Sequence, residues 1–162
     1  MNDPATILKA DHREAKRLMT ALAETEEGAE RETMANELNE ALTLHMEIEE
    51  RILYPLVAKE VGAEDEEEAE IEHGLAREGL ATLMSMVDKP GFGAAVEMLK
   101  GGILHHVEEE ETEIFPELKS SLDRAEWLAV GDAIAEAKAS AGKPVPTTPG
   151  RRSGKRKASN RR

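Results

Sequence analysis

Apolar residues recur along this chain at spacings of three and four, which is the spacing of one face of an α-helix. The first stripe predicts a helix from about Pro4 to about Glu24, with Asp3 as its N-cap. The second predicts a helix from about Arg31 to Glu60, in which Pro55 should produce a kink. The two stripes consist of Leu8, His12, Ala15, Met19 and Leu22, then Leu38, Leu42, His45, Glu49, Ile52 and Leu56.

Two more stripes predict a third helix that opens at Glu64 and a fourth from about Gly93 to Leu118. A short fifth helix should start at Asp123, where a capping box with Glu126 is expected. The stripes consist of Ala69, His73, Ala76, Leu80, Leu83 and Val87, then Val96, Leu99, Ile103, His106, Glu110 and Ile114. The pattern predicts an all-α fold over residues 1–141, an antiparallel up-down four-helix bundle with a short C-terminal fifth helix.

The two halves of this predicted bundle repeat one another. His106 follows His45 by 61 positions (106 − 45 = 61), and the same offset relates Glu110 to Glu49 and His73 to His12. The repeated elements are an acid before the first histidine, a His-x3-Glu motif and an aromatic residue followed by proline. Such a repeat predicts a pseudo-two-fold axis in the fold.

Each of the four stripes contains one histidine, and two of them also contain a glutamate, at positions 49 and 110. An inward carboxylate needs a partner, because burying an unpaired charge is costly. We therefore expect two metal ions in the bundle core, one held by His12 and His45, the other by His73 and His106, with Glu49 and Glu110 as bridges. Imidazole with carboxylate suits iron, while zinc and manganese stay open on ligand type.

Composition narrows the function classes. The 162 residues include no cysteine, which excludes disulfides and thiolate metal sites, and only 2% are aromatic, so the core must be aliphatic. No apolar run approaches a membrane span and no secretory signal is visible, so a cytoplasmic protein is expected, with no membrane partner.

Charge is distributed unevenly along the chain. The net charge is −13, yet residues 142–162 contain eight Lys or Arg and no acid, which leaves −21 for the rest (−13 − 8 = −21). We expect this basic tail to be disordered and dispensable for iron binding. It could contact nucleic acid, an anionic partner or the acidic body itself, or serve only as a solubilising extension.

The motifs as a set resemble the haemerythrin-like, or HHE cation-binding, domains over roughly residues 4–140. They are Asp11-His12, His45-x3-Glu49-Glu50 with Tyr54-Pro55, Glu72-His73, and His106-x3-Glu110-Glu111 with Phe115-Pro116. The resemblance implies a non-haem di-iron centre that reacts with dioxygen or related small oxidants. It implies His12, His45, His73 and His106 as terminal ligands and Glu49 and Glu110 as bridges.

The sequence departs from the oxygen carriers of that family, which have a second histidine where Arg77 stands here. The carriers also place an aspartate one residue after the position of Glu110. A site poorer in histidine favours sensing, peroxide or nitric-oxide chemistry, or iron handling over reversible oxygen transport. A ferritin-like storage protein is the alternative, because Glu70-x2-His73 matches the Glu-x2-His motif of that fold in one half of the chain.

Several other residues are expected to have lesser roles. Glu50 and Glu111 are candidates to hold the ligand side chains in place without binding the metal. Tyr54 could form a hydrogen bond near the site, although simple packing is the favoured role. His105 points about 100° away from His106 around the helix and is not expected to be a ligand. Gly101 and its neighbour Gly102 are expected to let another helix approach closely.

Overall fold

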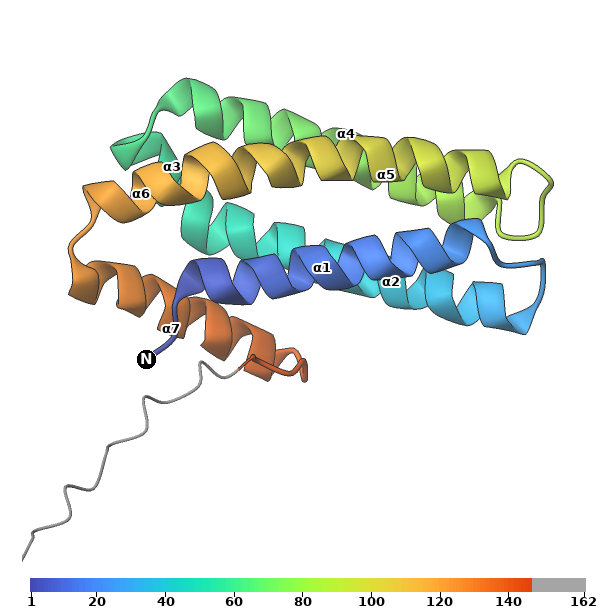
Figure 1. Cartoon of the computed structure of the whole chain (residues 1–162), viewed down its shortest axis with the longest axis horizontal. Helices are drawn as coiled ribbons and strands as arrows, with labels where there is room; N and C mark the ends of the chain where they lie inside the picture. The colour runs from blue at the N-terminus through green and yellow to red at the C-terminus, as the bar shows by residue number, and fades with distance from the viewer. Residues whose placement is uncertain (147–162) are drawn as a thin grey trace, which may run out of the picture.

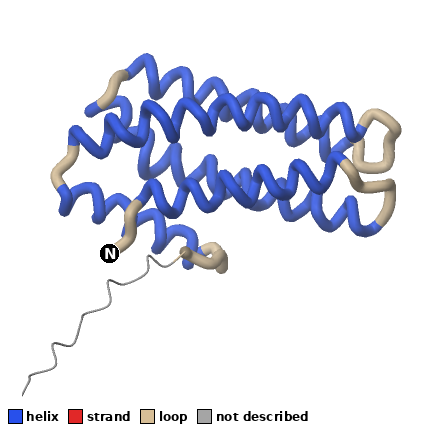
Figure 2. Tube along the Cα trace, viewed as in Figure 1, coloured by secondary structure: helices blue, strands red, loops and turns tan. Residues whose placement is uncertain are grey.

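The computed structural model describes residues 1–146, and these residues form helices and turns without any strand (Figure 2). The all-α prediction is confirmed, and the chain is a helical bundle. Its elements are α1 (Pro4–Ala23), α2 (Ala29–Ile48), η1 (Glu49–Leu53), α3 (Tyr54–Glu60), α4 (Ala63–Ser85), α5 (Phe92–Glu109), η2 (Glu110–Ile114), α6 (Phe115–Ser121) and α7 (Arg124–Ser140), where η marks a π-helical turn.

The four longest helices, α1, α2, α4 and α5, run along the long axis of the molecule (Figure 1). The packed pairs are α1 with α2, α2 with α4, α4 with α5 and α5 with α1, so each long helix touches two others. Helix α7 packs mainly on α1 and also touches α2 and η1. The four long helices therefore enclose one common interior, and each of them contributes one face to it.

The apolar core consists of two clusters, and in α1 and α4 the histidine comes between them along the helix. In α1, Leu8 belongs to one cluster and Ala15 to the other, and His12 lies between these two residues. In α4, Ala69 and Ala76 flank His73 in the same way. Burying a leucine-sized side chain contributes about 2 kcal/mol, so these clusters supply stability that holds a polar layer in the interior.

The second predicted helix is interrupted, and the kink expected at Pro55 is a π-helical turn. Tyr54 donates its N–H to the Glu49 carbonyl five residues earlier, and Phe115 donates to Glu110 in the second half. Each wide turn ends two residues before a proline, Pro55 or Pro116, whose missing N–H and bulky ring disfavour a regular α-helical turn. The repeat therefore extends to the backbone irregularity.

The π turn moves the buried face by one residue, which corrects the predicted stripe. Ile52 and Leu56, expected in the core, are only partly buried. Leu53, Tyr54 and Val57 are completely buried instead. A regular helical period cannot anticipate this change, because the π turn adds a residue without changing the sequence pattern before it.

Helix α7 is attached to the N-terminal segment by a hydrogen bond and a close backbone contact. Asp123 accepts a hydrogen bond from the Glu126 N–H, and the Glu126 carboxylate accepts one from the Asp123 N–H, which confirms the predicted capping box. The Trp127 indole donates to Asp3, the N-cap of α1, at 2.9 Å. A Cβ at Gly131 would overlap the Asn2 carbonyl oxygen, so this glycine permits the close contact.

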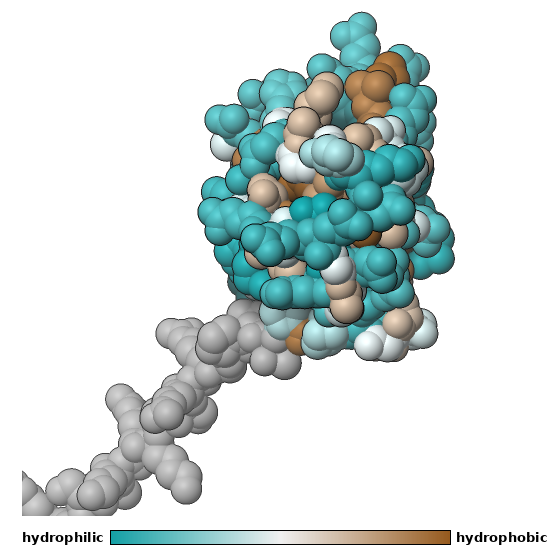
Figure 3. All heavy atoms as spheres, turned by 90° about the vertical axis from the view of Figure 1, so that its right-hand side faces the viewer, coloured by the Kyte–Doolittle hydropathy of each residue, from teal (hydrophilic) through white to brown (hydrophobic). Residues whose placement is uncertain are grey.

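The expectation for Gly101 and Gly102 is wrong. Both residues are exposed, and a Cβ added at either would meet nothing within 4 Å. The end of the bundle with the α1–α2 and α4–α5 connections presents mostly hydrophilic residues (Figure 3). Among residues 1–146, no helix is both long enough and apolar enough to cross a membrane.

Five residues of the basic tail, 142–146, are described, and Val145 packs against the core cluster that contains Ile7. The remaining tail residues lie outside the described part of the chain. The proposed domain boundary at 141 and the disorder expected beyond it therefore stay predictions.

Candidate metal centre

All six residues predicted as ligands meet in one buried layer of the bundle. They form two overlapping groups, and within each group the potential ligand atoms lie within 4.8 Å of one another. Glu49 and Glu110 are 0% exposed and the four histidines between 1% and 6%. The first group consists of His12, His45, Glu49 and Glu110, and the second of Glu49, His73, His106 and Glu110.

The histidines face each other in pairs. His12 Nε2 lies 3.1 Å from His45 Nε2, and the equivalent distance between His73 and His106 is 3.0 Å. Each pair joins two helices: α1 with α2 in the first half, and α4 with α5 in the second. The pairing therefore follows the internal repeat.

The two glutamates connect the histidine pairs. Glu49 places Oε1 3.2 Å from His45 Nε2 and Oε2 3.3 Å from His73 Nε2. Glu110 places Oε1 3.2 Å from His106 Nε2 and Oε2 3.2 Å from His12 Nε2. Each carboxylate thus reaches one histidine of each half, which is the arrangement required of a bridge.

Each of the four histidines has a carboxylate at Nδ1, the ring nitrogen that faces away from the glutamates. The outer nitrogen, Nδ1, lies 2.8 Å from Glu111 in His12 and 3.1 Å from Glu50 in His73, as expected for these two acids. Two further contacts complete the set: Asp11 lies 3.1 Å from His45 Nδ1, and Glu72 lies 2.7 Å from His106 Nδ1.

Sequence reasoning noted the acid before His12 and before His73 but missed its role. Each acid serves the histidine of the neighbouring helix, not the histidine beside it in the chain. The available signal was that the acid-His pair occurs at the same place in both halves.

This arrangement fits a cation held between the inner nitrogens. An ionised carboxylate only accepts hydrogen bonds, so it fixes the proton of a neutral imidazole on Nδ1 and leaves the Nε2 lone pair free. All four Nε2 lone pairs then converge on the two buried carboxylates. Within residues 1–146, Glu49 Oε1, Glu49 Oε2 and Glu110 Oε2 have no hydrogen-bond partner. Lone pairs and unpartnered anionic oxygens in one buried space require positive charge there.

Protons supply that charge when no metal is present. Burial alone would lower the pKa of His45, but Glu49 and Asp11 together outweigh it and raise that pKa to about 10. Burial also acts to lower the pKa of His106, which Glu110, Glu49 and Glu72 raise to about 9. The imidazoles in turn hold the pKa of Glu49 well below its usual range despite its burial. A metal ion must therefore displace protons to bind.

The two halves differ in their aromatic residue. The Tyr54 hydroxyl donates to Glu110 Oε1 at 2.9 Å and also lies 2.9 Å from His73 Nε2. Phe115, its counterpart in the repeat, stacks on the His12 ring with centroids 6.0 Å apart and brings no polar group. Tyr54 therefore does more than pack, and its hydroxyl makes the second group of ligands more polar.

The two halves also differ in the basic side chains that pair with the carboxylates at the outer histidine nitrogens. Arg77 forms a two-point ion pair with Glu50, with both distances 2.7 Å, and lies outside the ligand cluster. This guanidinium lowers the pKa of Glu50. In the first half, Lys138 of α7 binds Asp11, and this lysine is only 6% exposed. No sequence pattern singles out Lys138, because its partner is distant in the chain.

His105 lies outside the six-residue cluster. It is exposed and pairs with Glu109 on the next turn of α5 at 3.0 Å. With Glu72 it forms a third, largely surface group of potential ligand atoms.

Comparisons with known proteins agree with this arrangement. A protein named DNA nickase from Nostoc sp. (strain PCC 7120 / SAG 25.82 / UTEX 2576) is 26% identical over 117 residues. The match covers 72% of this chain but only 33% of that protein, so the chain spans about a third of the relative's length. No solved structure matches the chain. The family model of the Hemerythrin HHE cation binding domain matches residues 3–118, a region that contains all six clustered residues. The chain therefore belongs to the hemerythrin HHE cation-binding family.

Proposed function

We propose that this protein is a non-haem di-iron protein that binds or senses dioxygen or a related small oxidant. The observation that carries the proposal is the pair of buried carboxylates, each reaching one histidine of both halves, with three of their four oxygens lacking a hydrogen-bond partner. The underlying frame is the up-down four-helix order of α1, α2, α4 and α5, which the chain of helix contacts supports. Two equal sets of two histidines, sharing two carboxylates, favour two ions per chain.

Iron is the metal that we propose, on ligand type. Histidine together with carboxylate suits iron, and bundle cores are where paired metal ions with carboxylate ligands are built. The paired Nε2 atoms lie 3.1 and 3.0 Å apart, so both nitrogens of a pair could contact one ion.

The residues of this chain have separable tasks around such a centre. When bound, a pair of irons supplies reversible one-electron steps at a position where small oxidants can bind. The carboxylates behind the histidines fix the ring orientation and keep Nε2 free of its proton. Burial of Glu49 and Glu110 excludes water, which strengthens every electrostatic interaction within the layer. Tyr54 donates a hydrogen bond at the edge of the second group.

Binding or sensing is favoured over reversible transport, because the oxygen carriers have an additional histidine where Arg77 stands. The Arg77 guanidinium is bound to Glu50 and leaves that position without a ligand. The alternative functions are a di-iron enzyme with peroxidase, oxidase or nitric-oxide activity, and iron storage. A pocket that reaches the histidines is compatible with an enzyme as well as with a sensor.

Absorption spectra of the iron-loaded protein under nitrogen, oxygen and peroxide test the proposal. A spectrum that changes under oxygen and returns under nitrogen supports binding or sensing. Continuous consumption of peroxide without a stable new spectrum supports the enzyme, and uptake of many irons per chain supports storage. A spectrum that none of these gases or oxidants alters would contradict an oxidant-responsive centre.

A second candidate activity concerns nucleic acid. The Nostoc relative bears the name DNA nickase, and the sequence of the present chain has eight cations in residues 142–162. We propose weak, sequence-independent contact of this tail with DNA, which should decline as salt rises. The full chain and a chain ending at Gly142 are compared for DNA retention and for nicking of a supercoiled plasmid. Equal retention by both chains would exclude a role for the tail.

A further inference from the structure

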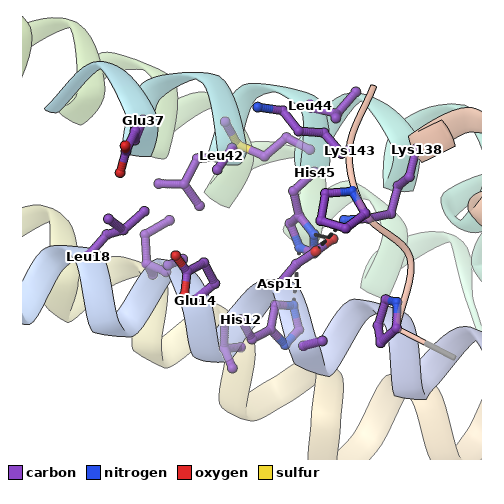
Figure 4. Close-up of a pocket in the computed structure, with 18 of the residues that line it drawn as sticks. Asp11, His12, Glu14, Leu18, Glu37, Leu42, Leu44, His45, Lys138 and Lys143 are labelled. Carbon is purple, nitrogen blue, oxygen red and sulfur yellow. Dashed lines mark hydrogen bonds and ion pairs between the residues drawn. The ribbon is translucent and has the colours of Figure 1, made fainter. Parts of the chain in front are cut away.

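A pocket of about 660 Å³ opens between α1 and α2 and reaches all four clustered histidines. Figure 4 shows its mouth, with Asp11, His12 and Leu18 on one helix opposite Leu42 and His45 on the other. The pocket begins at the metal-ligand layer and extends along the helices toward the α1–α2 turn. It is therefore continuous with the candidate centre but much larger than the space among the ligands.

The walls beyond the histidines are aliphatic. Helix α1 contributes Ala15 and Leu18, α2 contributes Leu42 and Met46, and α5 contributes Ile103 and Val107. Covering such a surface with an apolar molecule releases water and stabilises the complex by about 25 cal/mol for each Å² covered.

The volume exceeds what a diatomic oxidant requires. A water molecule occupies about 30 Å³ in the liquid, and dioxygen is of comparable size. Pockets of about 300 to 1,000 Å³ are those in which proteins enclose organic molecules of drug-like size. A narrow passage would suffice for gas entry, so the chamber has room for a much larger molecule.

Most charged groups on the lining are paired with a group of opposite charge. Asp11 is bound by Lys138, and Glu14 is bound by Arg17 at 2.6 Å. Lys143 lies 3.6 Å from Glu40. Glu37, the remaining carboxylate of the lining, is exposed to solvent. A neutral molecule therefore fits the interior of the pocket best.

One wall comes from the segment that follows α7. Gly142 adopts φ = 72°, in the left-handed region that favours glycine, and its N–H donates to the Ala139 carbonyl. The Lys143 N–H donates back to the Lys138 carbonyl at 3.0 Å. This helix-ending turn directs residues 143–146 over the mouth of the pocket, where they form part of its lining. We call these four residues the strap.

We propose that this pocket binds a neutral, apolar organic molecule, enclosed by the strap and held against the histidine layer. Such a ligand goes beyond the binding of a small oxidant, because it places an organic molecule next to the metal centre. The site is formed by side chains of the protein alone. Binding should therefore be measurable in the metal-free chain and does not depend on the identity of the metal.

Fluorescence titration with N-phenyl-1-naphthylamine, a neutral apolar probe, tests the proposal on the full-length chain with and without iron. We expect saturable binding of one probe per chain. Decanol should displace the probe at least about tenfold more effectively than decanoate or decylammonium, a difference of about 1.4 kcal/mol. Absence of saturable binding, or stronger displacement by either charged compound, would overturn the proposal.

A variant pair tests the location. Ala41 of α2 lines the pocket, whereas Ala81 of α4 is exposed and lies outside the lining. Both positions are helical alanines, so the same substitution can be made at each. Ala41→Phe should weaken probe binding about tenfold or more, and Ala81→Phe should leave it unchanged. Equal affinity in the two variants would place the probe elsewhere.

Nuclear magnetic resonance of the wild-type chain provides a test that does not depend on folding of a variant. Decanol should shift the methyl signals of Leu18, Leu42 and Val145. Shifts centred on the exposed Ile71 or Met98 would indicate nonspecific surface binding and overturn the proposal. Iron content is measured on the same samples: probe binding without iron loading refutes the di-iron function alone, and iron loading without probe binding refutes the pocket alone.

Discussion

At the scale of single residues, the ligand candidates could be predicted because they repeat at a fixed offset on helical stripes. The groups that hydrogen-bond to these ligand candidates were harder to predict, because Asp11, Glu72 and Lys138 act across helices. Spacing within a helix says which residues share a face, but it does not say which face of which neighbour they meet. A hydrogen bond of Tyr54 near the site could be anticipated, but its partner could not, because Glu110 lies in a distant part of the chain.

Tyr54→Phe tests the role of the hydroxyl. Its removal leaves a buried Glu110 oxygen without a donor, which should cost the metal-free protein about 1 kcal/mol of unfolding free energy. Iron content should stay at the wild-type level, because the hydroxyl is not among the six proposed ligands. Urea unfolding and elemental analysis measure the two quantities. A loss of one iron per chain would instead make Tyr54 a ligand.

At the scale of helices, the long elements could be predicted because their stripes are regular, and the π turns could not. A proline in the sequence indicates that the helix is disturbed, but it does not indicate whether the disturbance is a kink, a break or a π turn. The consequence is visible at Leu53 and Tyr54, which are buried where Ile52 and Leu56 were expected. The starts of α1 and α7, by contrast, agree with the sequence, because the caps Asp3 and Asp123 have local signals.

Deleting Arg51, an exposed residue of η1, tests the π turn. Without it the turn should close to a regular α-helical one, which removes the added residue and keeps Tyr54 on the same face as Glu49. Leu53 and Tyr54 then stay in the core, so the unfolding free energy should fall by only about 1 kcal/mol. Deleting Asn36, an exposed residue of the regular helix α2, is the control, because it rotates the rest of the helix by about 100° and should cost several kcal/mol, on the order of 2 to 5. Urea unfolding measures both losses, and equal losses in the two deletions would contradict the account.

Lys138→Met tests the attachment of α7 to the ligand layer. The change leaves the Asp11 carboxylate without its cation and should destabilise the metal-free protein by about 1 to 3 kcal/mol. Adding Asp11→Asn should recover part of this loss, because the uncompensated charge is then removed. Urea unfolding of the single and double variants measures the coupling. Strictly additive losses would show that the two side chains do not interact.

At the scale of the whole molecule, the bundle is a frame of two apolar clusters around one charged layer. The inward histidines and glutamates of the sequence indicated this layer. The pocket could not be predicted from the sequence, because it depends on how α1, α2 and the strap meet. The tail beyond residue 146 lies outside the described residues, and its predicted disorder is not tested.

The charged layer makes the stability of the metal-free protein depend on pH. In the folded state the pKa values of His45 and His106 are raised to about 10 and about 9, from about 6.5 in an unfolded chain. Between these values the folded state holds more protons, so its stability is fully present below about pH 6.5 and is lost as pH rises toward 10. Urea unfolding across this range should show the decline. Iron loading should abolish it, because ligated imidazoles have already lost those protons; an unchanged slope after loading would contradict ligation by these histidines.

The metal content of three purified proteins tests the central claim most directly. Elemental analysis after loading under iron-replete conditions should give two irons per chain for the wild type and for Glu47→Ala, whose side chain is exposed on the other side of α2. Glu49→Ala removes a bridging carboxylate from both halves and should reduce the content well below two while the helix content is preserved. A wild-type chain without bound metal, or a Glu49→Ala chain that still holds two irons, would contradict the di-iron centre.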